Sequence, residues 1–121
     1  MSYQITLDES TMLVQVIYAG PASLTKRMRA VSDVCTQYAH LAPLNILVDV
    51  RRLNMELSLD EQKYFGEYLA THPVLANAKV AVLHPPGHNP NLIIDATAFA
   101  NGYRLAQFNL QRDAASWLLQ P

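Results

Sequence analysis

The sequence predicts an α/β fold: a mixed, mostly parallel sheet with an antiparallel N-terminal strand, covered by four helices. Two observations predict it. Strand-like and helix-like segments alternate along the 121 residues in the order ββαβαβαβα, and short connections join them. No internal repeat or long linker interrupts this order, so we expect residues 1–121 to form a single domain.

The first two strands are predicted to form an antiparallel hairpin. Apolar and polar side chains alternate from Tyr3 to Leu7, and Met12 to Tyr18 is rich in valine and isoleucine. Gly20-Pro21 is expected to end the second strand, because proline is common in the first turn of a helix.

The first helix should be amphipathic. Its predicted apolar stripe comprises Leu24, Met28, Val31, Cys35 and Tyr38. The opposite face, which we expect to be solvated, carries Lys26, Arg27, Arg29, Asp33 and Gln37. Because Cys35 lies on the stripe, it is predicted to be a buried, inert thiol.

The middle of the chain contains the clearest signals. Asn45–Val50 is a nearly continuous apolar run, typical of a central strand that is covered on both faces. A polar loop is predicted from Arg51 to Leu57. Ser58 and Glu61 then form a capping box at the start of the second helix, whose predicted buried residues are Phe65, Tyr68 and Leu69 and whose end is set by Thr71-His72-Pro73.

Two further strand and helix pairs complete the fold. Lys79–Leu83 and Arg104–Phe108 are predicted strands. Between them, helical spacing links Leu92, Ala96, Phe99 and Tyr103, with Asn101-Gly102 as the stop. In the last helix Asn109 is the expected cap, and the predicted face is Leu110, Ala114, Trp117 and Leu118.

Composition excludes several classes of function. Nine basic residues against ten acidic ones argue against a nucleic-acid binder or a polybasic membrane binder. A single cysteine, no recognisable secretory signal, and no apolar run near the ~20 residues of a membrane helix predict a cytoplasmic protein without stable membrane insertion.

A ligand or partner is expected at the carboxyl ends of the parallel strands. Two segments leave that edge, Arg51–Leu57 and the octet HPPGHNPN, which spans His84 to Asn91. His84 and His88 are candidate contact residues, but a metal site needs about three protein ligands, and prolines preclude a helix here. We therefore predict no metal and no cofactor, and favour a stiff exposed loop.

The segment after the central strand offers two kinds of contact. Arg51 and Arg52 could hold a carboxylate or phosphate, or be solvated or paired with Glu56 or Asp60. The apolar side chains that alternate with polar ones could cap the core, line a pocket or form a partner patch, and a self-complementary patch would give a homodimer. These residues are Leu53, Met55 and Leu57.

No catalytic constellation is present. The chain lacks a G-x-S-x-G elbow and a phosphate-cradling glycine loop. Asp49, at the end of the central strand, is the best-placed acid but has no evident nucleophile beside it. We therefore expect a protein that is not an enzyme.

The strand ILVDV, the loop RRLNMEL, the helix start SLDEQKYFGEYL and the terminal AASWLL resemble the SpoIIAA-like branch of the STAS superfamily. The resemblance spans essentially the whole chain. It implies kinship with anti-sigma-factor antagonists, which bind a partner protein and are switched by phosphorylation of a serine at a helix start. It also implies structural kinship with CRAL-TRIO lipid carriers.

The phosphorylation motif itself is incomplete. Gly66 matches the family's helix glycine, whereas Leu57 replaces its acid and Asp60 its motif glycine. The family motif has two serine positions. Leu59 replaces the serine that is phosphorylated in the family, and Ser58 occupies the other position. Ser58 is therefore either a phosphorylation site, at a helix N-terminus that favours a phosphate, or simply a cap.

Two functions follow as hypotheses. The first is a non-enzymatic regulatory or protein-interaction module that binds an unknown protein through Arg51–Asp60. The alternative is a small carrier of a lipid-like or apolar ligand, held in a cleft between the second and third helices.

Overall fold

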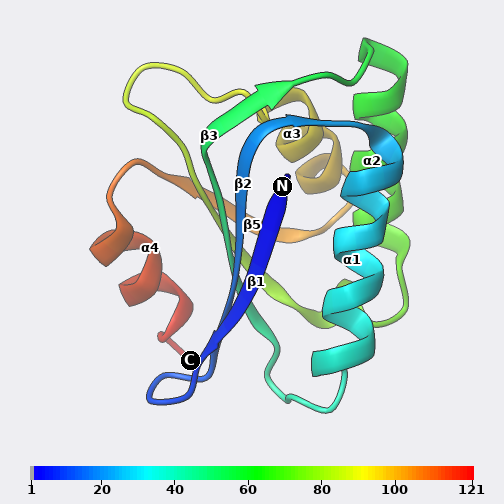
Figure 1. Cartoon of the computed structure of the whole chain (residues 1–121). Helices are drawn as coiled ribbons and strands as arrows, with labels where there is room; N and C mark the ends of the chain where they lie inside the picture. Colours follow the sequence, from blue (N-terminus) through cyan, green and yellow to red (C-terminus); the bar gives the residue numbers. More distant parts are fainter. Residues whose placement is uncertain (1) are drawn as a thin grey trace.

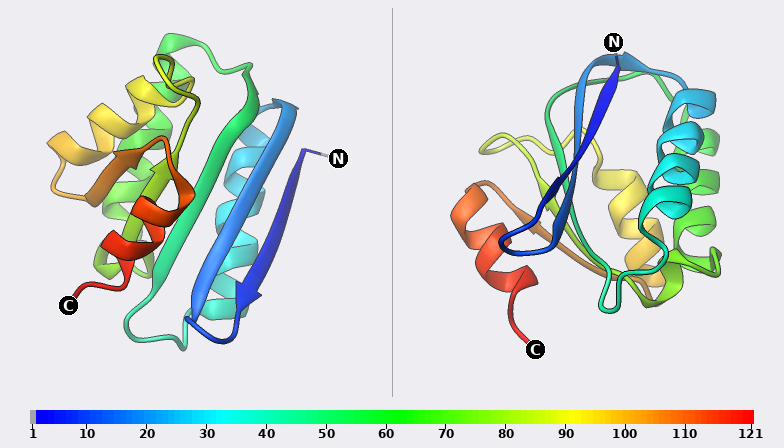
Figure 2. Two further views of the ribbon diagram at one scale, coloured as in Figure 1. Left: turned by 90° about the vertical axis from the view of Figure 1, so that its left-hand side faces the viewer. Right: turned by 60° about the horizontal axis from the view of Figure 1, so that its bottom comes forward.

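A computed structural model describes residues 2–121 and contains one five-stranded sheet with strand order β1-β2-β3-β4-β5. β1 is antiparallel to β2, and all the other pairs are parallel (Figures 1 and 2). The strands are β1 (Tyr3–Asp8), β2 (Leu13–Ala22), β3 (Asn45–Met55), β4 (Lys79–Leu83) and β5 (Arg104–Phe108). The predicted fold class and element order are confirmed.

Three helices cover one face of the sheet and one helix covers the other (Figure 1). The first three are α1 (Leu24–Tyr38), α2 (Leu59–Thr71) and α3 (Leu92–Ala100), and the fourth is α4 (Gln111–Leu118). A short 3-10 helix, η1 (Leu75–Asn77), precedes β4. β2 to β5 add in one direction across the sheet, so right-handed crossovers place all three connecting helices on the same face.

The two faces of the sheet pack into two separate apolar clusters. Val80 and Val82 of β4 contribute to the large core under the three helices, whereas Ala81 and Leu83 contribute to a smaller core under α4. All five residues of β4 are buried. A strand covered on both faces has no solvent side, which explains its uninterrupted apolar sequence.

The predicted end of the second strand at Gly20-Pro21 is wrong. β2 continues through both residues to Ala22, and Gly20 has a φ of +76°. Beyond Tyr18, β2 pairs only with β3, so Pro21 lies on a locally exposed edge where its missing N–H leaves no strand bond unmade. Pro21 thus lies outside the helix, which starts at Leu24, and the Ser23 hydroxyl caps it by accepting from the backbone amide of Lys26.

The predicted faces of α1 are rotated from the observed ones. Its buried residues are Arg27, Ala30, Val31 and Val34. The predicted stripe residues Leu24, Met28, Cys35 and Tyr38 are only partly buried. Arg27, predicted to be solvated, is 2% exposed.

The predicted loop after the central strand is mostly strand. β3 runs on to Met55, pairing with β2 up to Met55 opposite Ala22. Leu53 and Leu57 are buried while Arg52 and Asn54 are exposed. The alternation read as loop composition is therefore the period-2 pattern of a strand.

The stripe predicted for the third helix is also wrong. Phe99 is 67% exposed and Leu92 is 52% exposed, Tyr103 lies beyond the helix end, and the buried positions are Ile94, Asp95 and Ala98. Gly102 has the predicted left-handed conformation, with a φ of +89°.

In α4 the N-cap position is Leu110, without a side-chain cap, instead of Asn109. Ala114 and Leu118 are buried as predicted. The strands Lys79–Leu83 and Arg104–Phe108 and the end of α2 at Thr71 are confirmed. None of the helices within residues 2–121 is both long and apolar enough to cross a bilayer.

Candidate functional site

A cavity of about 60 Å³ lies between the three-helix layer and the sheet. Its walls are mainly the apolar side chains of the large core, from Val16 and Ile46 on the sheet to Phe65 and Leu69 on α2. Five side chains with polar atoms also line it, namely Tyr18, Arg27, Asn91, Asp95 and Tyr103.

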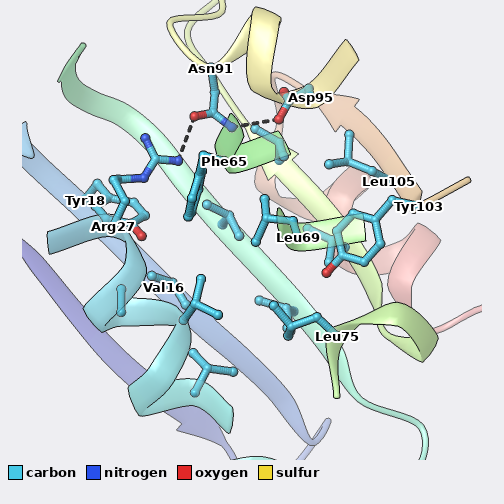
Figure 3. Close-up of a pocket in the computed structure, with 17 residues that line it drawn as sticks. Val16, Tyr18, Arg27, Phe65, Leu69, Leu75, Asn91, Asp95, Tyr103 and Leu105 are labelled. Carbon is cyan, nitrogen blue, oxygen red and sulfur yellow. Dashed lines mark hydrogen bonds between the residues drawn. The ribbon is translucent and has the colours of Figure 1, made fainter. Parts of the chain in front are cut away.

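The charged and amide groups gather at one end of the cavity, where Figure 3 shows Arg27, Asn91 and Asp95 opposite Leu75. Arg27 ends the first turn of α1, which follows β2, and Asn91 precedes α3, which follows β4. Both therefore sit where the chain leaves the carboxyl end of a parallel strand. Open α/β sheets commonly bind their ligands at this edge.

The guanidinium of Arg27 is enclosed by aromatic rings. Its central carbon lies 4.5 Å from the ring centroid of Tyr18 and 5.1 Å from that of Phe65. Nη2 donates a 2.7 Å hydrogen bond to Oδ1 of Asn91. Nε and Nη1 are buried and have no hydrogen-bond partner among residues 2–121. Most of the hydrogen-bonding capacity of this buried cation is therefore unused.

Asn91 connects Arg27 to a buried carboxylate. Its Nδ2 donates to Oδ1 of Asp95 at 2.7 Å, while Oδ2 of Asp95 accepts from Asn89 at 2.9 Å and from Gln107 at 3.1 Å. Burial raises the pKa of Asp95, and the three donors and the charge of Arg27 oppose that rise. Asp95 accepts hydrogen bonds from three side chains, whereas only Nη2 of Arg27 has an acceptor among residues 2–121.

The octet His84–Asn91 belongs partly to this site. Its asparagines do, because the side chains of Asn89 and Asn91 both donate hydrogen bonds to Asp95. The backbone amide of Asn91 donates to Oδ1 of Asn89. The predicted contact residues His84 and His88 are not among the lining residues. Nδ1 of His84 lies 2.8 Å from the carbonyl oxygen of Pro85, and His88 is exposed.

The other predicted contact residues lie elsewhere. Arg51 forms a salt bridge with Asp49 at 2.8 Å, not with Glu56 or Asp60, and its hydrogen bond to Asp49 raises the pKa of Arg51. Arg52 is exposed. Leu53, Met55 and Leu57 pack into or against the large core, which favours the core-capping alternative over an exposed patch.

Ser58 acts as a helix cap. Its hydroxyl accepts from the amide of Glu61 at 3.1 Å, and the Glu61 carboxylate accepts from the amide of Ser58 at 2.9 Å, so the capping box is confirmed. Ser58 is exposed, and its phosphorylation stays a prediction.

The cavity is located beneath the helices, not between α2 and α3. A Cβ added to Gly66 would lie 2.7 Å from the carbonyl oxygen of Ile94 and 2.8 Å from Cβ of Thr97. The two helices thus approach to backbone contact at Gly66, which leaves no cleft between them at that point.

Sequence reasoning missed the buried polar residues. Arg27 precedes Ala30, Val31 and Val34 by three, four and seven positions, the helical spacing of a shared face. Counting alanine as a core residue would have placed Arg27 on the buried side. No comparable signal marks Asp95, because its partners come from a loop and a neighbouring strand.

The remaining reactive groups form no centre. Within residues 2–121, no three His, Cys, Asp or Glu side chains are grouped to hold a metal ion. Cys35 is partly buried, with Sγ 3.9 Å from the ring nitrogens of His72, and burial raises the pKa of the thiol. A raised pKa suits an unreactive thiol.

Comparisons with known proteins show the fold. No model of a known protein family matches the chain, and no curated protein matches its sequence. A similar solved structure is an uncharacterised protein of the DUF3478 family with a SpoIIAA-like fold, from Shewanella loihica PV-4. The TM-score is 0.66 at 16% identity, over 97% of this chain and 92% of that one. The chain therefore has a SpoIIAA-like fold, which confirms the fold that the resemblance implied.

Proposed function

We propose that this chain is a STAS-like binding module, without catalytic activity, that holds a small and largely apolar molecule in the cavity between the three-helix layer and the sheet. The observation that carries the proposal is the cavity itself. It is about 60 Å³ in volume and lined mainly by apolar side chains of the large core. Small ligands generally bind in apolar pockets that contain a few placed polar groups.

The arrangement of polar groups supports binding over catalysis. The acid that lines the cavity, Asp95, accepts three hydrogen bonds. These bonds use three of the roughly four lone-pair positions of a carboxylate and hold Asp95 in place. Arg27 has unused donors, which suits recognition of a ligand.

Xenon is a direct probe of the cavity, because this neutral atom enters apolar cavities without needing a polar contact. We expect xenon to shift the methyl NMR resonances of Val34, Leu75 and Val80, which line the cavity. The methyl resonances of Leu119, exposed beyond α4, serve as the internal control.

Filling the cavity provides the matched variant. Ala30 lines the cavity from α1, so Ala30→Leu should occupy its space and abolish the xenon shifts while the fold is kept. Absence of xenon shifts in the unmodified protein would contradict the proposal. Equal shifts in both proteins would place the xenon elsewhere and contradict it as well.

A second candidate function, binding of a partner protein through Arg51–Asp60, is favoured by one feature of β3. Pairing with β4 ends at Asp49 opposite Leu83, whereas pairing with β2 continues to Met55. Residues 50–55 therefore have no strand beside them on the β4 side within the described part of the chain. An open strand edge can accept an extended peptide.

This candidate is tested by a photo-crosslinking residue at Asn54, which is exposed on the open strand, and by a control at Glu67, which is exposed on α2. We expect a discrete crosslinked protein from the native host only with Asn54. Crosslinks of equal yield at both positions, or none at Asn54, would contradict it.

A further inference from the structure

We propose that the molecule held in the cavity is a short-chain carboxylate, whose head group is bound by Arg27 and whose carbon chain lies among the apolar walls. This inference rests on the proposed function, since it requires that the cavity bind a ligand. It adds the chemical class of that ligand and the residue that selects it.

The donors of Arg27 define the head group. A guanidinium has five N–H donors, and the hydrogen bond that Arg27 makes to a described residue uses Nη2. Nε and Nη1, which carry three of the five, are buried and without a partner among residues 2–121. A buried donor that is left unpaired is costly, so an acceptor supplied by a ligand would stabilise the folded protein.

The charge of Arg27 favours an anionic acceptor. No carboxylate within residues 2–121 forms a salt bridge with it. Asp95, which lines the same end of the cavity, is linked to Arg27 only through Asn91 and already accepts from three side chains. Tyr18 and Phe65 lie against the guanidinium, and Nε and Nη1 have no partner among residues 2–121. A carboxylate has the planar shape that matches the edge of a guanidinium.

The volume and walls of the cavity limit the rest of the ligand. A water molecule needs roughly 10–15 Å³ of such space, so the cavity accommodates about four to six non-hydrogen atoms. A carboxyl group takes three of them, which leaves a chain of one to three further carbons. The apolar walls, among them Val34, Ile46 and Val80, favour such a chain over a hydroxylated or charged one.

The experiment is calorimetric titration of the full chain with butyrate and with butyramide, which has the same shape but no charge. Two variants are compared, Arg27→Met and the matched control Arg29→Met, an exposed arginine on the same helix. We expect butyrate to bind about tenfold or more tighter than butyramide to the unmodified protein and to Arg29→Met. Arg27→Met should lose this preference by weakening butyrate alone.

Chain length is tested with acetate. Butyrate should bind more tightly than acetate, because additional methylene groups are buried. If Arg27→Met fails to fold, Arg27→Lys keeps the charge but loses the planar fork, and should give an intermediate preference.

Each other outcome overturns the inference in a distinct way. Equal affinity for butyrate and butyramide would remove the role of charge but leave the proposed function standing. Equal affinity for acetate and butyrate would leave an anion site without an apolar pocket. Failure of butyrate to bind, while xenon still enters the cavity, would refute the carboxylate alone, whereas failure of both would refute the proposed function too.

Discussion

At the scale of residues, the proposed ligand binding would be coupled to stability through Arg27. It is 2% exposed, forms a hydrogen bond to Asn91, and makes no salt bridge with any residue of the described chain. A buried charge without a direct partner normally destabilises a fold. Under the proposed function, the ligand would supply the partner that this buried charge lacks.

This reasoning predicts an unusual result for Arg27→Met in the absence of ligand. Methionine keeps the unbranched stem and removes the charge, at the expense of the hydrogen bond to Asn91. We expect the free energy of unfolding in urea to stay within about 1 kcal/mol of the unmodified protein, or to rise. A loss of about 3–5 kcal/mol, typical of a broken buried ion pair, would contradict this view of Arg27.

Asp95 should make stability depend on pH. Burial raises its pKa above the ordinary value of 3.8, so the folded protein binds this proton more tightly than the unfolded chain does. The contribution of Asp95 to stability is therefore complete below pH 3.8 and is lost as the pH rises through the raised pKa. Urea unfolding across this range should show less decline with pH in Asp95→Asn. Parallel pH profiles of the two proteins would contradict the raised pKa.

At the scale of elements, α2 and α3 pack by direct backbone contact at Gly66. Gly66→Ala would bring a methyl group to 2.7 Å from the carbonyl oxygen of Ile94. We expect a loss of about 1–3 kcal/mol in the free energy of unfolding, even though alanine favours helices. Glu67→Ala, at an exposed neighbouring position, should change stability by less than about 0.5 kcal/mol. Equal effects of the two substitutions would mean that the helices lie further apart.

Substitution of Ser58 separates the structural role of this serine, as the cap of α2, from a regulatory role. Ser58→Ala removes the acceptor for the backbone amide of Glu61. We expect the free energy of unfolding, measured by thermal denaturation, to fall by about 1 kcal/mol. Ser58→Asp retains an acceptor and should restore most of it. A Ser58→Ala protein as stable as the unmodified one would show that the cap contributes little and leave phosphorylation as the reason for this serine.

Element boundaries were predictable where a local signal sets them. The Ser58–Glu61 box, the proline after His72 and the apolar run of β4 each fixed a boundary that the structure confirms. The C-terminal extensions of β2 and β3 were missed because they are stabilised by pairing with each other. Residues 20–22 pair with residues 53–55, and a contact between segments this far apart leaves no local signal in the sequence. The predicted faces of α1 and α3 were wrong because Arg27 is buried and Phe99 is exposed, which reverses the usual burial preferences of charged and aromatic side chains.

At the scale of the whole molecule, the fold was predictable and the candidate site was not. Alternating strands and helices imply the layered sheet, since the handedness of crossovers leaves few arrangements. The site, in contrast, joins Arg27 after β2 to Asn91 after β4, together with Gln107 on β5. Residues this far apart meet only once the sheet is assembled. The sequence pointed to this edge of the sheet, but the contact residues predicted on it are not the ones that line the cavity.

The most direct test of ligand binding beneath the three helices is an isotope-filtered NOE experiment on the protein with saturating butyrate. We predict contacts from the terminal methyl of butyrate to methyl groups of the cavity walls, such as those of Val34 and Val80. Contacts solely to exposed side chains, such as Leu92 and Phe99 on α3, would place butyrate on the surface and contradict the assignment of the cavity as its binding site.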